Sequence, residues 1–205
     1  MQKIHILDYG MGNLQSVQNG LKKLGLDASI SSNCDDIKNA HKLIFPGVGH
    51  FGKAMQNLKQ LDLLEVLHEI VLIKKIPVLG ICLGMQLMAK SSEEGDVDGL
   101  GWFDASVKKI EIRDNIKYKI PHTGWNTIQI QKESELMKGI PDEGEFYFVH
   151  AYHVQCANIS DVLNTTVYDQ PFVSAIEKDN IFGVQYHPEK SHAIGKKLIN
   201  NFIKL

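Results

Sequence analysis

The sequence predicts an α/β fold: a single domain with a central, mostly parallel sheet flanked by helices, and added antiparallel strands in the second half. In the first half, short β-rich runs alternate with amphipathic segments, an order typical of βαβ units and a parallel sheet. After residue 105, strand-like stretches separated by turn residues replace that alternation and favour mixed or antiparallel strands on the same sheet. No linker rich in proline, glycine or serine interrupts the 205 residues, so we expect one domain over residues 1–205.

The alternation gives the elements of the first half in order. Strands are expected at residues 3–8, 27–31, 42–45 and 77–81. The amphipathic segments between them predict helices over residues 14–24, over residues 51–73 and from residue 83 onward. In the second half, the β-rich runs predict strands at residues 106–112, 125–130, 145–154, 161–168, 172–178 and 180–187, followed by a closing helix over residues 190–204.

Composition excludes several classes of function. With 22 basic and 24 acidic residues, the net charge of -2 gives no electrostatic basis for binding nucleic acid or an anionic membrane. The chain shows neither a signal peptide nor an apolar run of about 18 residues, and we expect a cytoplasmic protein. Cys34, Cys82 and Cys156 lie far apart without a paired motif, which predicts reduced thiols rather than a disulfide scaffold or a structural zinc site.

One cysteine stands at a turn that suits a nucleophile. Cys82 lies between Gly80 and Gly84 in a G-x-C-x-G pattern, where an expected strand gives way to an expected helix. This is the nucleophile-elbow arrangement with sulfur in place of oxygen. Glycines let two backbone segments approach closely, a helix N-terminus stabilises a thiolate, and the Leu83 N–H becomes a candidate oxyanion donor. For this pattern alone, a small cysteine buried beneath a helix is an equally good interpretation.

A candidate base stands at the end of a later strand. Pro188 pushes His187 toward an extended conformation, so the side chains of His187 and Glu189 are expected on one side. Glu189 is then placed to orient the imidazole while the other ring nitrogen faces the thiol, which predicts a Cys-His-Glu triad. A lone histidine near a strand end is more often merely exposed or hydrogen-bonded, but its combination with the elbow favours catalysis.

Two glycine-rich turns and a histidine pair complete the candidates. A backbone N–H from Val48 or Gly49, after an expected strand, is a candidate second oxyanion donor, although an ordinary strand-to-helix turn would carry the same glycines. The turn at residues 8–13 lacks the third glycine of a dinucleotide fingerprint and is expected to line a surface beside the site. His150 and His153 stand three apart on one expected strand, hence on opposite faces, so no metal ion is implied.

Together these motifs resemble the class I, or triad, glutamine amidotransferase family, in which an elbow cysteine, a histidine and a glutamate cleave the side-chain amide of glutamine. More narrowly, glutaminase subunits of imidazole glycerol phosphate synthases are similar in the segments DYGMGNLQS, FPGVGHFGKAM, GICLGMQLM, PHTGWN, YFVHAYH and QYHPEKS. The similarity extends over nearly the whole chain. It implies L-glutamine as the substrate, no cofactor, and a heterodimer with a barrel-shaped cyclase subunit that uses the ammonia in histidine biosynthesis.

The resemblance also assigns roles to individual residues. It implies that Cys82 is the nucleophile, His187 the general acid and base, and Glu189 its orienter. The oxyanion region matches Val48, Gly49 and Leu83, and the positions against the bound glutamine match Gln86, His150 and Ala151. The motifs that border the cyclase interface contain Asn13, His122, Trp125 and Lys190.

Three alternatives stay open. The sequence departs from the family pattern at Thr123, Ala151 and His153, and similar glutaminases feed a cyclase-like partner in bacterial surface-sugar synthesis. A second alternative is a non-catalytic binding or regulatory protein with the same fold, against which the intact Cys/His/Glu set counts. A third is an elbow-cysteine hydrolase or chaperone of similar topology, against which the P-x-x-G-W-N and H-P-E-K-S segments count.

Overall fold

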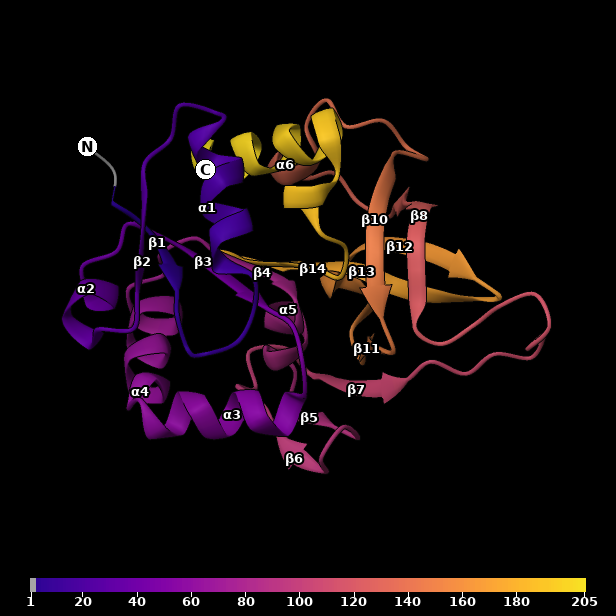
Figure 1. Ribbon diagram of the computed structural model, residues 1–205, viewed down its shortest axis with the longest axis horizontal. Coiled ribbons are helices and arrows are strands. Elements are labelled where there is room, and N and C mark those ends of the chain that lie inside the picture. The colour runs from indigo at the N-terminus through magenta and orange to yellow at the C-terminus, as the bar shows by residue number, and fades with distance from the viewer. Residues whose placement is uncertain (1–2) are drawn as a thin grey trace.

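The structure is a computed structural model that describes residues 3–205, and these residues form one large sheet with helices on both faces and a small sheet beside it (Figure 1). Among the described residues the large sheet has twelve strands, in the order β2-β1-β3-β4-β14-β13-β11-β7-β5-β6, with β12 paired to β13 and β9 paired to β12. The predicted α/β class with a parallel half and added antiparallel strands is confirmed.

The parallel half carries the chemistry at its carboxyl edge. Its strands are β1 (Ile4–Leu7), β2 (Ala28–Ser31), β3 (Lys42–Gly47), β4 (Val78–Cys82) and β14 (Ile181–Val184), each parallel to its neighbours within this group. Buried parallel strands have apolar side chains on both faces, and β3 and β4 are buried at every position. The last strand of the group, β14, comes from the far end of the chain, so residues about 100 apart in sequence meet at one edge.

Helices cover both faces of the large sheet (Figure 1). On one face lie α1 (Leu14–Lys22) and α6 (His192–Lys204). On the other lie α2 (Cys34–Lys38), α3 (Phe51–Gln60), α4 (Leu63–His68), the π-helical turn η1 (Glu69–Ile73) and α5 (Leu83–Leu87). Each face has its own cluster of buried apolar side chains. No helix within residues 3–205 has the length and apolar character needed to cross a membrane.

Two predicted helices differ from the structure in their extent. The helix expected over residues 51–73 is divided among α3, α4 and η1, because Asp62 adopts a left-handed conformation with φ of 54° and turns the chain. Aspartate is one of the few residues that enter this region readily. The helix expected from residue 83 ends at Leu87, after little more than one turn.

The antiparallel strands extend the same sheet, as predicted. The longer ones are β7 (Ala105–Lys109), β11 (Tyr152–Cys156), β12 (Val162–Tyr168) and β13 (Gln170–Lys178). The short ones are β5 (Ser91–Ser92), β6 (Val97–Asp98) and β9 (Gln129–Ile130), of which β5 is parallel to β7 and antiparallel to β6. Three turns of 3-10 helix connect this part of the chain: η2 (Glu135–Met137), η3 (Ile159–Asp161) and η4 (Pro188–Lys190).

One pair of strands leaves the large sheet, which the sequence did not predict. β8 (His122–Thr127) and β10 (Glu145–His150) pair only with each other among the described strands, antiparallel from Glu145↔Thr127 to His150↔His122. The single strand expected over residues 145–154 therefore divides at Ala151, where the chain passes from β10 to β11. His150 and His153 consequently lie in different sheets, and not on opposite faces of one strand.

Candidate active site

The elbow at Cys82 forms where β4 passes directly into α5. Cys82 has φ of 55° and ψ of -109°, a conformation that only glycine adopts without strain. The flanking glycines explain how the turn fits. A Cβ at Gly84 would overlap the carbonyl oxygen of Phe45 on β3, and a Cβ at Gly80 would lie 2.6 Å from the Met88 Cε. The G-x-C-x-G pattern therefore reflects the close packing of α5 on the sheet, and it presents the sulfur at the sheet's carboxyl edge.

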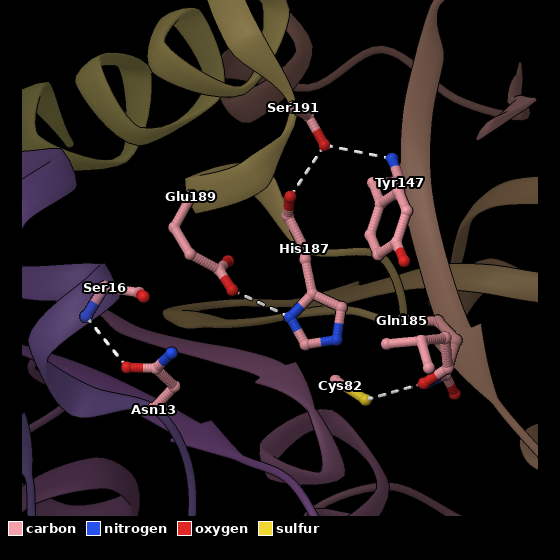
Figure 2. A network of polar contacts seen from close by, with 9 residues as sticks. Asn13, Ser16, Cys82, Tyr147, Gln185, His187, Glu189 and Ser191 are labelled. Carbon is pink, nitrogen blue, oxygen red and sulfur yellow. Dashed lines mark hydrogen bonds and ion pairs between the residues drawn. The ribbon is translucent and has the colours of Figure 1, made fainter. Parts of the chain in front are cut away.

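His187 reaches the elbow because β14 lies beside β4. The register pairs Gly183 with Gly80 and Val184 with Ile81, so the chain leaving β14 passes next to Cys82. The Nδ1 of His187 lies 2.8 Å from the Oε1 of Glu189, and both side chains are almost fully buried. Figure 2 shows the opposite edge of the imidazole turned toward Cys82. Its Nε2 has no hydrogen-bond partner within residues 3–205, which leaves it available to a reacting group.

The route by which Glu189 reaches His187 differs from the predicted one. An extended chain was expected to place the side chains of His187 and Glu189 on the same side. Instead, the chain turns into the 3-10 helix η4 at Pro188. Ser191, the last residue of the H-P-E-K-S segment and one to which the sequence assigned no role, fixes this turn. Its hydroxyl donates to the His187 carbonyl at 2.6 Å and accepts from the Tyr147 N–H of β10 at 3.0 Å (Figure 2). The serine of H-P-E-K-S therefore holds the base in place and joins it to the small sheet.

The environment of His187 favours its charged form. Burial alone opposes protonation, but the hydrogen bond to Glu189 and the negative charges of Cys82 and Glu189 outweigh it and raise the pKa of His187 to about 9. At neutral pH the site therefore holds an imidazolium between a carboxylate and a sulfur. An imidazolium next to a cysteine stabilises the thiolate, which is the nucleophilic form.

The predicted oxyanion residues lie on both sides of the sulfur. Gly47, at the end of β3, pairs in register with Cys82, so the turn that carries Val48 and Gly49 begins beside the elbow. Gly49 has φ of 112°, a value that favours glycine. Leu83 is the first residue of α5, and the first N–H groups of a helix have no partner within it.

A pocket of about 310 Å³ opens over the sulfur. Seven predicted residues line it, namely Val48, Gly49, Cys82, Leu83, Gln86, His150 and Ala151. Four more lining residues were not predicted: Glu94, Pro121, Val149 and Tyr152. Glu94 is the one carboxylate among these lining residues, and its Oε2 accepts the Phe51 N–H of α3 at 2.7 Å. Nothing in the acidic run around Glu94 distinguishes it in sequence from a solvated surface turn.

The outer wall of the pocket rests on two buried histidines. His150 Nδ1 lies 2.8 Å from the Tyr152 carbonyl, which can only accept, so this nitrogen carries the proton. His150 Nε2 therefore accepts from the Nδ1 of His122 at 3.0 Å. Burial lowers the pKa of His122 to about 4 and that of His150 to about 3, so both are neutral at pH 7.

The four residues expected at a partner interface differ in their accessibility. Asn13 is exposed and caps α1 by accepting from the Ser16 N–H at 3.1 Å (Figure 2). Trp125 is 45% exposed and stacks on His192, and Lys190 lies over the ring of Tyr147. His122 is only 2% exposed. It lies inside the outer wall and presents no surface of its own to a partner, because its ring is stacked between Phe148 and Tyr168.

Comparisons with known proteins cover the whole described chain. The family model described as glutamine amidotransferase class-I matches residues 5–205. A Methanococcus maripaludis protein named imidazole glycerol phosphate synthase subunit HisH 2 is 48% identical over 98% of both chains. A Leptospira borgpetersenii protein named subunit HisH of the same synthase is 42% identical over 98% of this chain and 100% of its own.

Solved structures share the fold at low sequence identity. The crystal structure of a putative GMP synthase protein from Thermoplasma acidophilum has a TM-score of 0.74 at 21% identity, over 100% of this chain and 93% of its own. The PurLQS structure from Thermotoga maritima has a TM-score of 0.73 at 14% identity, over 99% and 98%. At these identities the likeness concerns the fold, whereas the two HisH proteins are similar in sequence along their whole length.

Proposed function

The chain belongs to the class I glutamine amidotransferase family, and from that premise we propose that it is the glutaminase subunit of an imidazole glycerol phosphate synthase. It hydrolyses L-glutamine to L-glutamate and ammonia. The observation that carries the proposal is the His187–Glu189 pair, 2.8 Å apart, turned toward an elbow cysteine that lines a pocket. The names of the relatives, which cover essentially the full chain, favour this acceptor over the surface-sugar alternative.

The first half of the reaction forms a thioester. The Cys82 thiolate attacks the side-chain amide carbon of glutamine, and the carbonyl electrons move to the oxygen. Backbone N–H groups at Val48 or Gly49 and at Leu83 stabilise the resulting oxyanion. The His187 imidazolium gives its Nε2 proton to the amide nitrogen, the C–N bond breaks, and ammonia leaves. His187 is then a neutral base, held by Glu189 with Nε2 facing the thioester.

The second half reverses the proton transfer. His187 takes a proton from water at Nε2, and the hydroxide attacks the thioester carbon. The second oxyanion occupies the same donors, and its collapse breaks the C–S bond. Glutamate departs, and the site returns to a thiolate beside an imidazolium. The raised pKa of His187, about 9, matches this resting state.

The pocket orients glutamine by charge. Glu94 is the carboxylate of the lining, and one of its oxygens is held by the Phe51 N–H. We propose that the other carboxylate oxygen of Glu94 binds the α-ammonium group of glutamine. The pocket's 310 Å³ suits a ligand at the small end of the range for small-molecule sites.

Ammonia then has to reach an acceptor on another chain. We propose a heterodimer with a cyclase subunit whose contact surface includes Asn13, Trp125 and Lys190, while His122 supports that surface from inside. We place the complex in the cytoplasm, in keeping with free cysteines at positions 34, 82 and 156.

The test separates ammonia production from its use. Cys82→Ala is expected to abolish glutamine-dependent synthesis by the complex while synthesis from added ammonium salt continues, because the elbow only produces ammonia. Both activities are measured on the same assembled complex. If the two activities fall together while the complex still forms, Cys82 is not the ammonia-producing nucleophile.

A further inference from the structure

A buried amide touches the sulfur from the side opposite solvent. Gln185 is fully buried, and its Nε2 lies 3.5 Å from the Sγ of Cys82. It precedes His187 by two residues in the chain. Its backbone N–H donates to the Ser174 carbonyl at 2.9 Å, which holds this end of the strand against β13. Gln185 does not line the pocket.

The direction of the hydrogen bonds around Gln185 is fixed by a carbonyl. The Tyr152 oxygen can only accept, and the Gln86 side chain meets it at 2.9 Å, so that atom of Gln86 is Nε2. The same Nε2 donates to the Oε1 of Gln185 at 2.9 Å. The remaining atom of the Gln185 amide is therefore its NH2 group, and this is the group aimed at sulfur.

The orientation of the Gln185 amide has a chemical consequence at Cys82. A thiolate is a pure acceptor and is suited to the Gln185 N–H, whereas a thiol proton has the Val149 carbonyl, 3.8 Å from Sγ, as its acceptor. We propose that Gln185 is a further catalytic residue, whose amide N–H stabilises the Cys82 thiolate and holds the sulfur toward His187. Gln86 and the Tyr152 carbonyl are positioning groups that prevent the Gln185 amide from turning over.

The network explains why two glutamines are buried at the site. A buried amide without partners is unfavourable, and here the Gln185 amide and the Gln86 NH2 group are occupied by one another, by sulfur and by the Tyr152 carbonyl. That carbonyl also accepts from His150 Nδ1 at 2.8 Å. The sulfur is thus joined through Gln185, Gln86 and Tyr152 to the histidines of the outer wall.

The test measures the reactivity of Cys82 without glutamine or any partner, so its failure is distinguishable from a failure of the proposed function. The purified full chain is treated with iodoacetamide, and alkylation of the peptide that contains Cys82 is followed by mass spectrometry. For Gln185→Leu we expect alkylation about tenfold slower at pH values below the midpoint of the parent chain's pH–rate profile, where the rate follows the thiolate population, and tenfold is the size of one hydrogen bond to a charged group. Near pH 10, where thiols ionise without help, the two proteins should react alike.

A substitution that only disturbed the structure around Cys82 would slow its alkylation near pH 10 as well. Asn201→Leu is the matched control, because it removes a buried amide that donates to the Leu136 and Lys138 carbonyls far from the pocket. It should leave Cys82 alkylation unchanged. If Gln185→Leu does not fold, Gln185→Glu decides the question, because it keeps the acceptor for Gln86 and loses the donor to sulfur.

Glutamine turnover by the assembled complex provides a second measurement. Because Gln185 lies outside the pocket, kcat should fall about tenfold in Gln185→Leu with KM unchanged. Equal alkylation of the folded variant and the parent chain below the midpoint of the pH–rate profile would overturn the proposal. A loss of equal size below that midpoint and near pH 10 would also overturn it, because it would show altered access to sulfur and not a changed thiolate population.

Discussion

The two walls of the pocket are built in different ways. The inner wall, where Cys82 lines the pocket and His187 lies beside it, stands on the neighbouring parallel strands β4 and β14 and is fixed by backbone register. The outer wall, from Val149 to Tyr152, is the corner where the chain leaves the small sheet for the large one. Side-chain hydrogen bonds of His122, His150 and Gln86 hold that corner. The inner wall therefore supplies the reacting groups, and the outer wall shapes and closes the site around them.

The two walls also shift the pKa of their histidines in opposite directions. Contacts with Cys82 and Glu189 overcome the effect of burial and raise the pKa of His187, so the inner wall holds a charged histidine. Burial lowers the pKa of His122 and of His150, so the outer wall holds a neutral pair. One fold thus keeps histidines in opposite protonation states on the two sides of a pocket. Substitutions and pH changes should affect the two walls differently.

The largest expected effect is on the inner wall. His187→Ala should lower kcat for glutamine hydrolysis by about 10⁴-fold, close to the loss in Cys82→Ala, because His187 supplies both the positive charge beside the thiolate and the proton for the leaving nitrogen. Glu189→Gln should retain more activity, since the imidazole remains and only its orientation and charge are weakened. Steady-state glutamine turnover by the complex measures all three. Lower turnover in Glu189→Gln than in His187→Ala would contradict this division of roles.

The next effect concerns the stability of the elbow. Gly84→Ala should lower the free energy of unfolding by about 3 kcal/mol, because the added Cβ overlaps the Phe45 carbonyl of the adjacent strand. Gly20→Ala is the matched control, since its Cβ would meet nothing closer than 3.7 Å and alanine is the better helix former. Chemical denaturation compares the two variants. Equal stability of Gly84→Ala and the parent chain would show that the elbow tolerates a shift of α5.

The pH dependence of stability should separate the walls. For His122, the pKa of about 4 lies below its ordinary 6.5, so the unfolded chain binds the extra proton and stability falls as pH drops through this window. For His187, the pKa of about 9 lies above 6.5, so its contribution is full below pH 6.5 and is lost as pH rises to 9. Each shift corresponds to about 3 kcal/mol.

Replacing each histidine shows which one causes each pH dependence of the unfolding free energy. His122→Phe should flatten the loss of unfolding free energy between pH 6.5 and 4, and His187→Ala should flatten the loss between pH 6.5 and 9. Denaturation at a series of pH values measures both effects. If either substitution flattens the opposite side of the profile, the charge states assigned to the walls are wrong.

The smallest effect concerns coupling to a partner. A stand-alone glutaminase would waste glutamine, so we expect the isolated chain to be nearly idle and a ligand-bound cyclase to raise kcat more than it lowers KM. Gly49→Val should reduce that stimulation by about tenfold, because a β-branched residue at φ of 112° resists the rearrangement of the oxyanion turn. Gly20→Ala should leave the stimulation unchanged. Full stimulation in Gly49→Val would show that the turn at Val48 and Gly49 takes no part in activation by the partner.

Local patterns in the sequence were sufficient to predict the turn at Cys82 and the position of His187 at the end of a strand. The glycines around Cys82 and the proline after His187 each have a steric consequence that can be derived from neighbouring residues alone. The parallel pairing of β14 with β4 was not predicted, because the strand expected at residues 180–187 was placed among the mixed or antiparallel strands of the second half. The contribution of Ser191 was missed, because a single serine after a proline turn carries no signal until its partner Tyr147 is known.

The outer wall could not be predicted in the same way. The run at residues 145–154 is apolar and β-rich throughout, and nothing in it marks Ala151 as the point where one sheet ends and another begins. The His122–His150 contact depends on the register of β8 with β10, which long-range pairing sets. Gln86 was expected to face glutamine. Its hydrogen bonds to the Tyr152 carbonyl and to Gln185 could not be predicted, because they also depend on long-range pairing.

The most direct test of the proposed chemistry is to trap the covalent intermediate. The complex turns over glutamine, is quenched with acid, and is digested for mass spectrometry of the peptides that contain Cys34, Cys82 and Cys156. We predict a glutamyl thioester on the Cys82 peptide alone, and its absence in Cys82→Ala. A glutamyl group on either other cysteine, or steady turnover with no thioester at Cys82 under conditions that slow its hydrolysis, would contradict the proposed mechanism.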